Sequence, residues 1–109
     1  MPSRRTKATD ISAFSRAEVN DRDSYDGAPC CIIPGCGTPY NLEIAHYISR
    51  QKSGRGIPMN LVTLCIKHHR MFDTGRAEES NIINRQIKEY LQHCYGESWS
   101  EDNLRYQRE

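Results

Sequence analysis

The sequence predicts a single small α+β domain, for two reasons. Two short alternating segments, residues 42–48 and 61–64, are separated by a glycine-bearing loop, and a helical segment without a breaker follows from Cys65 to about Asp73. Only 37% of the 109 residues are hydrophobic, and the mean hydropathy is −0.78. A small domain with so little apolar material often needs a metal ion or disulfides to stay folded.

The N-terminal part, residues 1–22, is predicted to be a flexible basic tail up to about Lys7, followed by a helix from about Ser12 to Arg22. The segment Asp10–Ser12 carries residues that favour a helix N-cap. This helix offers only weak apolar contacts, which are Ile11, Phe14, Ala17 and Val19.

The central part, residues 23–80, is predicted to be the core. Residues 25–29 form a loop, and 31–38 form a tight knuckle because Pro34, Gly35 and Gly37 interrupt any regular element. The first strand is 42–48, residues 51–58 are a loop, and the second strand is 61–64. The helix that follows begins at Cys65 and ends at Gly75.

The C-terminal part, residues 81–109, is predicted to be a helix and a tail that pack on the core. Apolar residues recur at three- and four-residue steps over 81–95, as on one face of a helix; they are Ile83, Ile87, Tyr90, Leu91 and Cys94. We expect Trp99, Leu104 and Tyr106 to fold back on this helix.

The five cysteines indicate a reduced compartment. No apolar signal segment opens the chain, and no run approaches the ~18 apolar residues of a membrane helix. We therefore expect an intracellular, cytoplasmic protein without a membrane partner, in which clustered cysteines bind metal more often than they form disulfides.

The spacing of four residues predicts a structural zinc site. Cys31 and Cys36 flank a Pro-Gly turn, while Cys65 and His68 lie one helical turn apart. Zinc prefers four such ligands in a closed tetrahedron, and binding it would supply folding energy. Alternatives stay open at this point: Cys30 can replace Cys31, His69 can replace His68, and the cysteines can be buried and reduced without metal.

Positive charge is concentrated in residues 46–76. This segment has one acidic residue, Asp73, whereas both flanking parts are net negative. A local positive field is what a polyanion selects, although a solvated loop would carry the same residues. The basic side chains are Arg50, Lys52, Arg55, Lys67, Arg70 and Arg76.

The segments LEIAHYISR (42–50) and NLVTLCIKHH (60–69) resemble the HNH endonuclease family. The family pattern is a strand that ends in histidine, a glycine-bearing loop, an asparagine before Leu-x-x-Leu-Cys, and a final histidine on the helix. Here these residues are His46, Asn60 and His69. The flanking cysteine pairs, Pro34 to Gly37 and the tail up to Trp99 look like small phage-borne members.

The resemblance implies a ββα-metal (His-Me finger) core that hydrolyses DNA with Mg²⁺ or another divalent cation. His46 is the expected general base, and Asn60 is expected to fix the loop and orient His46. His69 is the expected ligand of the catalytic cation, with Asp73 beside it on the helix; an i,i+4 surface pair is the alternative for Asp73. The expected phosphate contacts, which position DNA without reading its sequence, are Arg50, Lys52 and Arg55.

One position departs from the family pattern. Relatives carry Asp, Glu or His just before the catalytic histidine, and Ala45 stands there. In the alternative register His46 is a ligand of the catalytic cation and Tyr47 is the base. We prefer His46 as base, because a phenol with a pKa of about 10 is a poor base at neutral pH.

Two other functions remain compatible with the sequence. One is a catalytically inactive, zinc-stabilised DNA-binding module, which the departure at Ala45 favours. The other is an assembly factor within a larger phage packaging or restriction machine, which would act in the cytoplasm of a bacterial host. The presence of His46, Asn60 and His69 together favours the nuclease.

Overall fold

The computed structural model describes residues 3–107 and confirms the α+β class. The predicted tails also include residues 1–2 and 108–109, which lie outside the described residues. The helices are α1 (Arg4–Thr9), α2 (Ala13–Arg22), α3 (Ile66–Thr74) and α4 (Ala77–Tyr95). The strands are β1 (Ser24–Tyr25), β2 (Ala28–Pro29), β3 (Leu42–His46) and β4 (Leu61–Cys65). Short 3-10 turns occupy Arg50–Lys52, Pro58–Asn60, Gly96–Ser98 and Glu101–Asn103.

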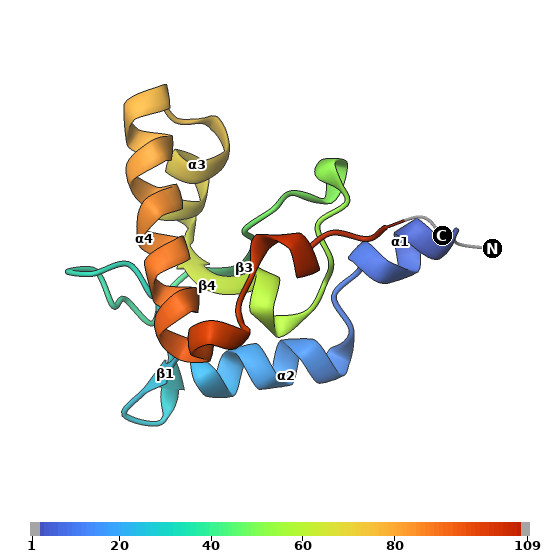
Figure 1. Cartoon of the computed structure of the whole chain (residues 1–109). Coiled ribbons are helices and arrows are strands. Elements are labelled where there is room, and N and C mark those ends of the chain that lie inside the picture. Colours follow the sequence, from blue (N-terminus) through green and yellow to red (C-terminus); the bar gives the residue numbers. More distant parts are fainter. Residues whose placement is uncertain (1–2, 108–109) are drawn as a thin grey trace.

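The antiparallel pair β3–β4 is the centre of the molecule, and α3 follows β4 without a loop (Figure 1). The pairing sets Leu42 opposite Cys65 at one end and His46 opposite Leu61 at the other. All five residues of β4 are buried. Both predicted strands are therefore present, and β3 ends at His46, two residues earlier than expected.

α4 runs beside α3 and past the hairpin, and the C-terminal segment returns over the hairpin (Figure 1). Ile83, Ile87 and Leu91 recur every four residues and are buried, as one face of an amphipathic helix should be. Trp99 and Leu104 join the same core, as predicted. The helix begins at Ala77, four residues before the expected start, so the predicted boundary between residues 80 and 81 falls inside α4.

Polar groups of other elements satisfy the outer edge of β4. The Thr63 amide donates to Asp23 Oδ2 (2.9 Å), and the Thr63 carbonyl accepts from the Ile32 amide (3.1 Å). Arg22 Nη2 donates to the Leu61 carbonyl (2.6 Å). An open strand edge would leave these backbone groups without partners, so these contacts fix α2 and the 30–38 segment against the sheet.

The ion pair of Arg22 with Asp23 is buried. Arg22 Nε and Nη2 donate to the two Asp23 carboxylate oxygens at 2.7 and 3.0 Å, and the Tyr90 hydroxyl donates to the same carboxylate. The Asp23 side chain has no exposed surface. The pair therefore links α2, β4 and α4 through one carboxylate.

Three local predictions about the first thirty residues were wrong. Part of the expected flexible tail is α1, whose N-cap Ser3 accepts from the Thr6 amide. The N-cap predicted within Asp10–Ser12 is confirmed: Ser12 caps α2 by accepting from Ser15 N at 3.0 Å. Phe14 is 78% exposed because α2 turns Ser15 and Val19 inward. Residues 25–29, expected as a loop, belong to the β1–β2 hairpin that begins at Ser24.

The segment that contains α1 lies along the loop after β3. The Gly56 amide donates to the Ala8 carbonyl (2.9 Å), and a Cβ at residue 56 would lie 2.0 Å from the Asp10 carbonyl oxygen. Arg5 donates to the carbonyls of Arg50 and Gln51. Glycine at position 56 is what allows this close approach.

We predict that Asp23→Ala lowers the free energy of unfolding by about 3–5 kcal/mol, because it leaves the Arg22 guanidinium buried without its partner. Urea denaturation followed by circular dichroism measures the change. Asp21→Ala, which removes an exposed carboxylate from the same helix, is the control and should change the value by less than about 0.5 kcal/mol. Equal midpoints for both variants would contradict the role of Asp23.

Candidate functional site

The knuckle that carries Cys31 and Cys36 is closed by backbone hydrogen bonds. The Cys36 amide donates to the Ile33 carbonyl and the Cys31 amide donates to the Thr38 carbonyl, both at 3.0 Å. Gly35 has a φ of 83°, in the left-handed region that favours glycine. The turn therefore points both thiols toward the start of α3.

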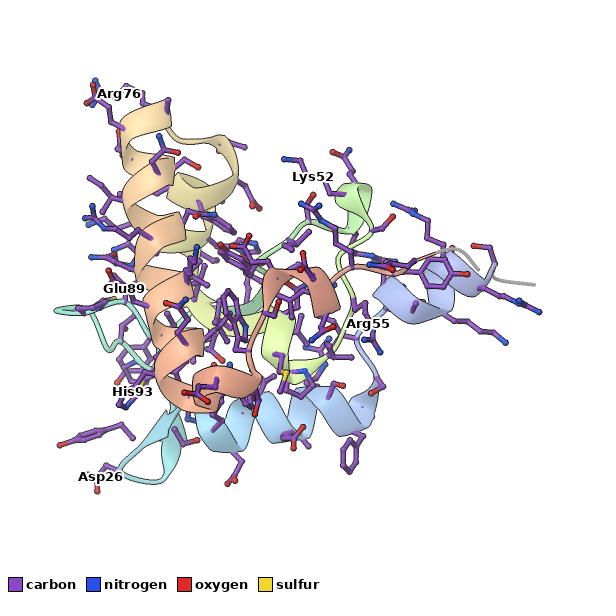
Figure 2. All side chains as sticks on the ribbon, in the orientation of Figure 1. Asp26, Lys52, Arg55, Arg76, Glu89 and His93 are labelled. Atoms are coloured by element: carbon purple, nitrogen blue, oxygen red, sulfur yellow. The ribbon has the colours of Figure 1, made fainter. Side chains whose placement is uncertain are left out.

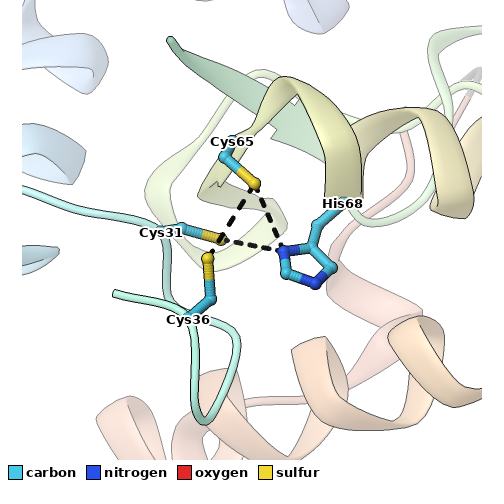
Figure 3. Close-up of side chains that lie close together, drawn as sticks. All are labelled: Cys31, Cys36, Cys65 and His68. Carbon is cyan, nitrogen blue, oxygen red and sulfur yellow. Dashed lines mark hydrogen bonds between the residues drawn. The ribbon is translucent and has the colours of Figure 1, made fainter. Parts of the chain in front are cut away.

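Four side chains meet at this point, as the spacing predicted (Figure 3). Cys65 is the N-cap of α3, and His68 follows in its first turn. His68 Nδ1 lies 3.3 Å from Cys65 Sγ and 3.6 Å from Cys31 Sγ, and Cys36 Sγ lies 4.0 Å from Cys65 Sγ. All four ligand atoms lie within 4.8 Å of one another, close enough to hold one metal ion.

These distances fit a zinc tetrahedron. Bond lengths of about 2.3 Å to sulfur and 2.0–2.1 Å to nitrogen give edges of about 3.8 Å between sulfurs and about 3.6 Å between sulfur and nitrogen. Cys30 is not in the cluster, because its thiol points to the Asp23 carbonyl at 3.5 Å. Cys94 is exposed on α4. Three-dimensional packing thus selects Cys31 over Cys30 and His68 over His69.

The electrostatics of the cluster suit a cation. Burial raises the pKa of the Cys31 thiol to about 12. The pKa of Cys36 is lowered. Burial acts to raise it, but hydrogen bonds from the Thr38 backbone and from the neighbouring thiols outweigh the effect of burial. Burial lowers the pKa of His68 and favours its neutral, metal-binding form. A divalent ion would offset the cost of a buried thiolate at Cys31.

His46, at the other end of β3, is held by the N-terminal segment. Its Nε2 lies 2.8 Å from the Thr9 carbonyl oxygen, which can only accept. Nε2 therefore carries the proton, and Nδ1 keeps a lone pair in the neutral ring. Burial lowers the pKa of His46, and the nearby Arg50 lowers it further. The neutral form thus prevails at neutral pH.

Tyr47 is less suited to act as a base. Its ring is buried against Trp99, with the ring centroids 5.8 Å apart, and its hydroxyl donates to Glu101 Oε1 at 2.6 Å. Burial and the neighbouring carboxylate both raise the pKa of the phenol.

A cleft of about 640 Å³ lies between α3, α4 and the loop after β3. His46 lines it, together with the carboxylates Asp73 and Glu101 and the cations Arg50, Lys52 and Arg105. Arg105 was not predicted from the sequence. It reaches the cleft because the C-terminal segment forms a β-bridge with the loop after β3, between Arg105 and Gly54. Its only signal in the sequence was its place among residues expected to fold back.

The three residues predicted to contact phosphate do not lie in one place. Arg50 and Lys52 line the cleft, and Arg50 also pairs with Asp10. Arg55 points elsewhere, since it donates to the Asn103 carbonyl at 3.2 Å and lines a separate recess. Figure 2 shows Lys52 at the outer end of the loop and Arg55 well away from it.

Asn60 fixes the loop, but it does not touch His46 as expected. Its side chain is buried and donates to the carbonyls of Ile48 (3.0 Å) and Arg55 (2.9 Å), while its Oδ1 accepts from the Ile48 amide (2.8 Å). The amide group therefore ties the two ends of the loop together. The orientation of His46 comes from Thr9.

His69 projects away from the cysteines and lies between two carboxylates. Its Nδ1 is 3.0 Å from Glu43 Oε1, and its Nε2 is 3.1 Å from Asp73 Oδ2. Asp73 is thus an i,i+4 partner of His69, which was the alternative expectation for it. Both ring nitrogens of His69 therefore face carboxylate oxygens in this arrangement. The contact of Glu43 with His69 was not predicted. Alternation along β3 could have indicated it, because Glu43 and Ala45 lie on the same face of the strand, toward α3.

The fold and the cluster define a small α+β protein in which three cysteines and one histidine lie close enough to hold a metal ion. The chain matches no family model and no curated protein. Among residues 3–107, no helix combines the length and the apolar character needed to cross a membrane.

We predict that the purified protein carries one zinc ion per chain and that Cys65→Ser loses both the zinc and the fold, because binding of a structural zinc is coupled to folding. Elemental analysis and circular dichroism measure the two losses. Cys30→Ser and Cys94→Ser are the matched controls and should keep both. A protein that contains no zinc and stays folded in a chelator would refute the prediction.

Proposed function

We propose that this protein is a metal-dependent endonuclease of the HNH type, which hydrolyses phosphodiester bonds of DNA. In this proposal β3, β4 and α3 form a ββα-metal core, and zinc bound to Cys31, Cys36, Cys65 and His68 is structural. The observation that carries the proposal is the state of His46. It is a neutral imidazole with one nitrogen held by Thr9 and the other without a hydrogen bond among residues 3–107, and it lines a cleft with three cations.

In the proposed reaction, His46 Nδ1 takes a proton from a water molecule, and the resulting hydroxide attacks the phosphorus of the scissile bond. The water must lie opposite the leaving oxygen, so the phosphate has to be held in one orientation. Arg50, Lys52 and Arg105 are the candidates for this task, because their charges complement a phosphate and they line the same cleft.

A divalent cation would neutralise charge on the phosphate and stabilise the departing oxygen. Asp73, an exposed carboxylate that lines the cleft, is the oxygen donor we assign to it. His69 can join only if it leaves Glu43 or Asp73, since these carboxylates engage its two nitrogens. The cation would thus compete with the ion pairs of His69.

The engagement of His69 also favours a second candidate, a zinc-stabilised module that binds DNA without cutting it. Such a module needs the cationic cleft and the zinc cluster but no free ligand on α3. Plasmid nicking by the wild-type protein with Mg²⁺, Mn²⁺ or Ni²⁺ separates the two candidates: the module would retard the plasmid on a gel and leave it intact.

We predict that His46→Ala lowers the nicking rate by about 10²–10⁴-fold, the usual contribution of a general base. Zinc content, folding and DNA affinity should stay close to wild type, because His46 belongs to the other end of the hairpin from the cysteines. Tyr47→Phe is the control for the alternative register and should cost far less. An active His46→Ala beside an inactive Tyr47→Phe would overturn the assignment of the base.

His69→Ala should also reduce nicking, through the dependence on divalent cation. We expect a higher concentration of Mg²⁺ or Mn²⁺ for half-maximal rate, which a metal titration measures. An unchanged titration curve would remove His69 from the cation site.

The pH dependence of the rate follows from the pKa of His46. Protonation of Nδ1 removes the base, so the rate should fall as pH decreases through a pKa below the usual value of about 6.5. Above that value the rate should be flat with respect to this group. Single-turnover rates across the pH range, with zinc content checked at each pH, test this. A midpoint above neutral pH, or the same limb in His46→Ala, would contradict it.

A further inference from the structure

A second recess, of about 620 Å³, lies at the opposite end of the β3–β4 hairpin from His46. It is lined by residues just before β3 and by the first turns of α3, and it also contacts Cys36 and Cys65 of the metal cluster. The residues of interest are Tyr40, Lys67 and Arg70. The mechanism proposed above uses none of them.

Tyr40 presents its ring to solvent. It is 73% exposed, and the Thr38 hydroxyl accepts from its backbone amide at 3.3 Å. The next residue, Asn41, has a φ of 54°, and its carbonyl accepts from the Ile66 amide at 3.0 Å. This turn fixes Tyr40 beside the start of α3.

Lys67 and Arg70 lie three residues apart on α3, and hence on one face of the helix. Both are exposed. Within residues 3–107 neither makes a salt bridge or a side-chain hydrogen bond, and none of the residues that line the recess is acidic. The cations are thus available to an anionic ligand.

An exposed aromatic ring beside two unpaired cations is a combination that suits single-stranded nucleic acid. The ring stacks on an unpaired base, and the cations hold the flanking phosphates. An acidic peptide would use the cations but has no need of the ring, and the bases of an intact duplex are stacked and cannot cover it.

We propose that Tyr40, Lys67 and Arg70 form a binding site for single-stranded DNA, with an unpaired base on Tyr40 and phosphates on Lys67 and Arg70. The choice of DNA rests on the proposed function, whereas the preference for a single strand rests on Tyr40.

The test measures binding rather than cleavage. Fluorescence anisotropy with a labelled single strand of about 12 nucleotides, within the range of known single-strand sites, is performed on the zinc-loaded full chain without added divalent cation. Tyr40→Ala should weaken binding roughly 5- to 150-fold, the range expected for one stacked base. Tyr40→Phe keeps the ring and should bind like wild type. Tyr25→Ala removes an equally exposed tyrosine elsewhere and should have no effect.

The cations are tested through salt dependence. Lys67→Gln and Arg70→Gln should each reduce the slope of log K against log salt by about 0.7, the value for one phosphate contact on a single strand. Arg85→Gln, an exposed cation on α4, is the control and should leave the slope unchanged. Zinc content verifies that each variant keeps its metal site.

Three results would overturn the proposal: Tyr40→Ala binds like wild type, a duplex of the same length binds as tightly as the single strand, or polyglutamate competes as well as unlabelled DNA. Failure of the nuclease is a separate outcome. A wild-type protein that binds single strands through Tyr40 but nicks no plasmid supports this site and refutes the nuclease. A nicking enzyme whose Tyr40→Ala variant binds normally does the reverse.

Discussion

The buried carboxylate of Asp23 is the contact on which the rest of the structure depends. It accepts from Arg22, from the Tyr90 hydroxyl and from the Thr63 amide, and so joins two helices to the outer edge of β4. Arg22 adds its own bond to the Leu61 carbonyl. A charge this deeply buried costs free energy unless its partners are all in place. The hydrogen bonds of the Asp23 carboxylate can therefore all form in only one arrangement of α2, β4 and α4.

The hairpin that is fixed in this way has the cysteine–histidine cluster at one end and the cleft with His46 at the other. Its pairing sets Leu42 against Cys65, beside the metal cluster, and His46 against Leu61, beside the cationic cleft. The α3 helix begins directly at the cluster end of the hairpin and positions Cys65 and His68. The knuckle supplies the other two cluster residues, Cys31 and Cys36. This separation places the cysteine–histidine cluster, which could hold a metal ion, apart from the accessible cleft.

The N-terminal segment completes the cleft end, although it contributes none of the residues expected there. Thr9 supplies the carbonyl that holds His46, and Gly56 lets this segment approach the loop. The sequence does not show which backbone carbonyl will bind a side chain. It also does not show which glycine is required because a distant segment packs too close for a Cβ atom. The state of His46 is thus a property of packing between elements far apart in sequence.

The sequence by itself determined whatever rests on local spacing: the two strands, the helix after Cys65, the knuckle, and the presence of one pair of potential metal ligands on the knuckle and another at the start of that helix. Periodicity and turn-forming residues act over a few positions, so such features can be predicted without knowing how distant elements pack. Only the tertiary structure decided between Cys30 and Cys31, and between His68 and His69. It also brought Glu43 to His69, separated Arg55 from the cleft and buried Asp23. These outcomes depend on the angle at which distant elements meet, because that angle sets which of two adjacent side chains faces the common centre.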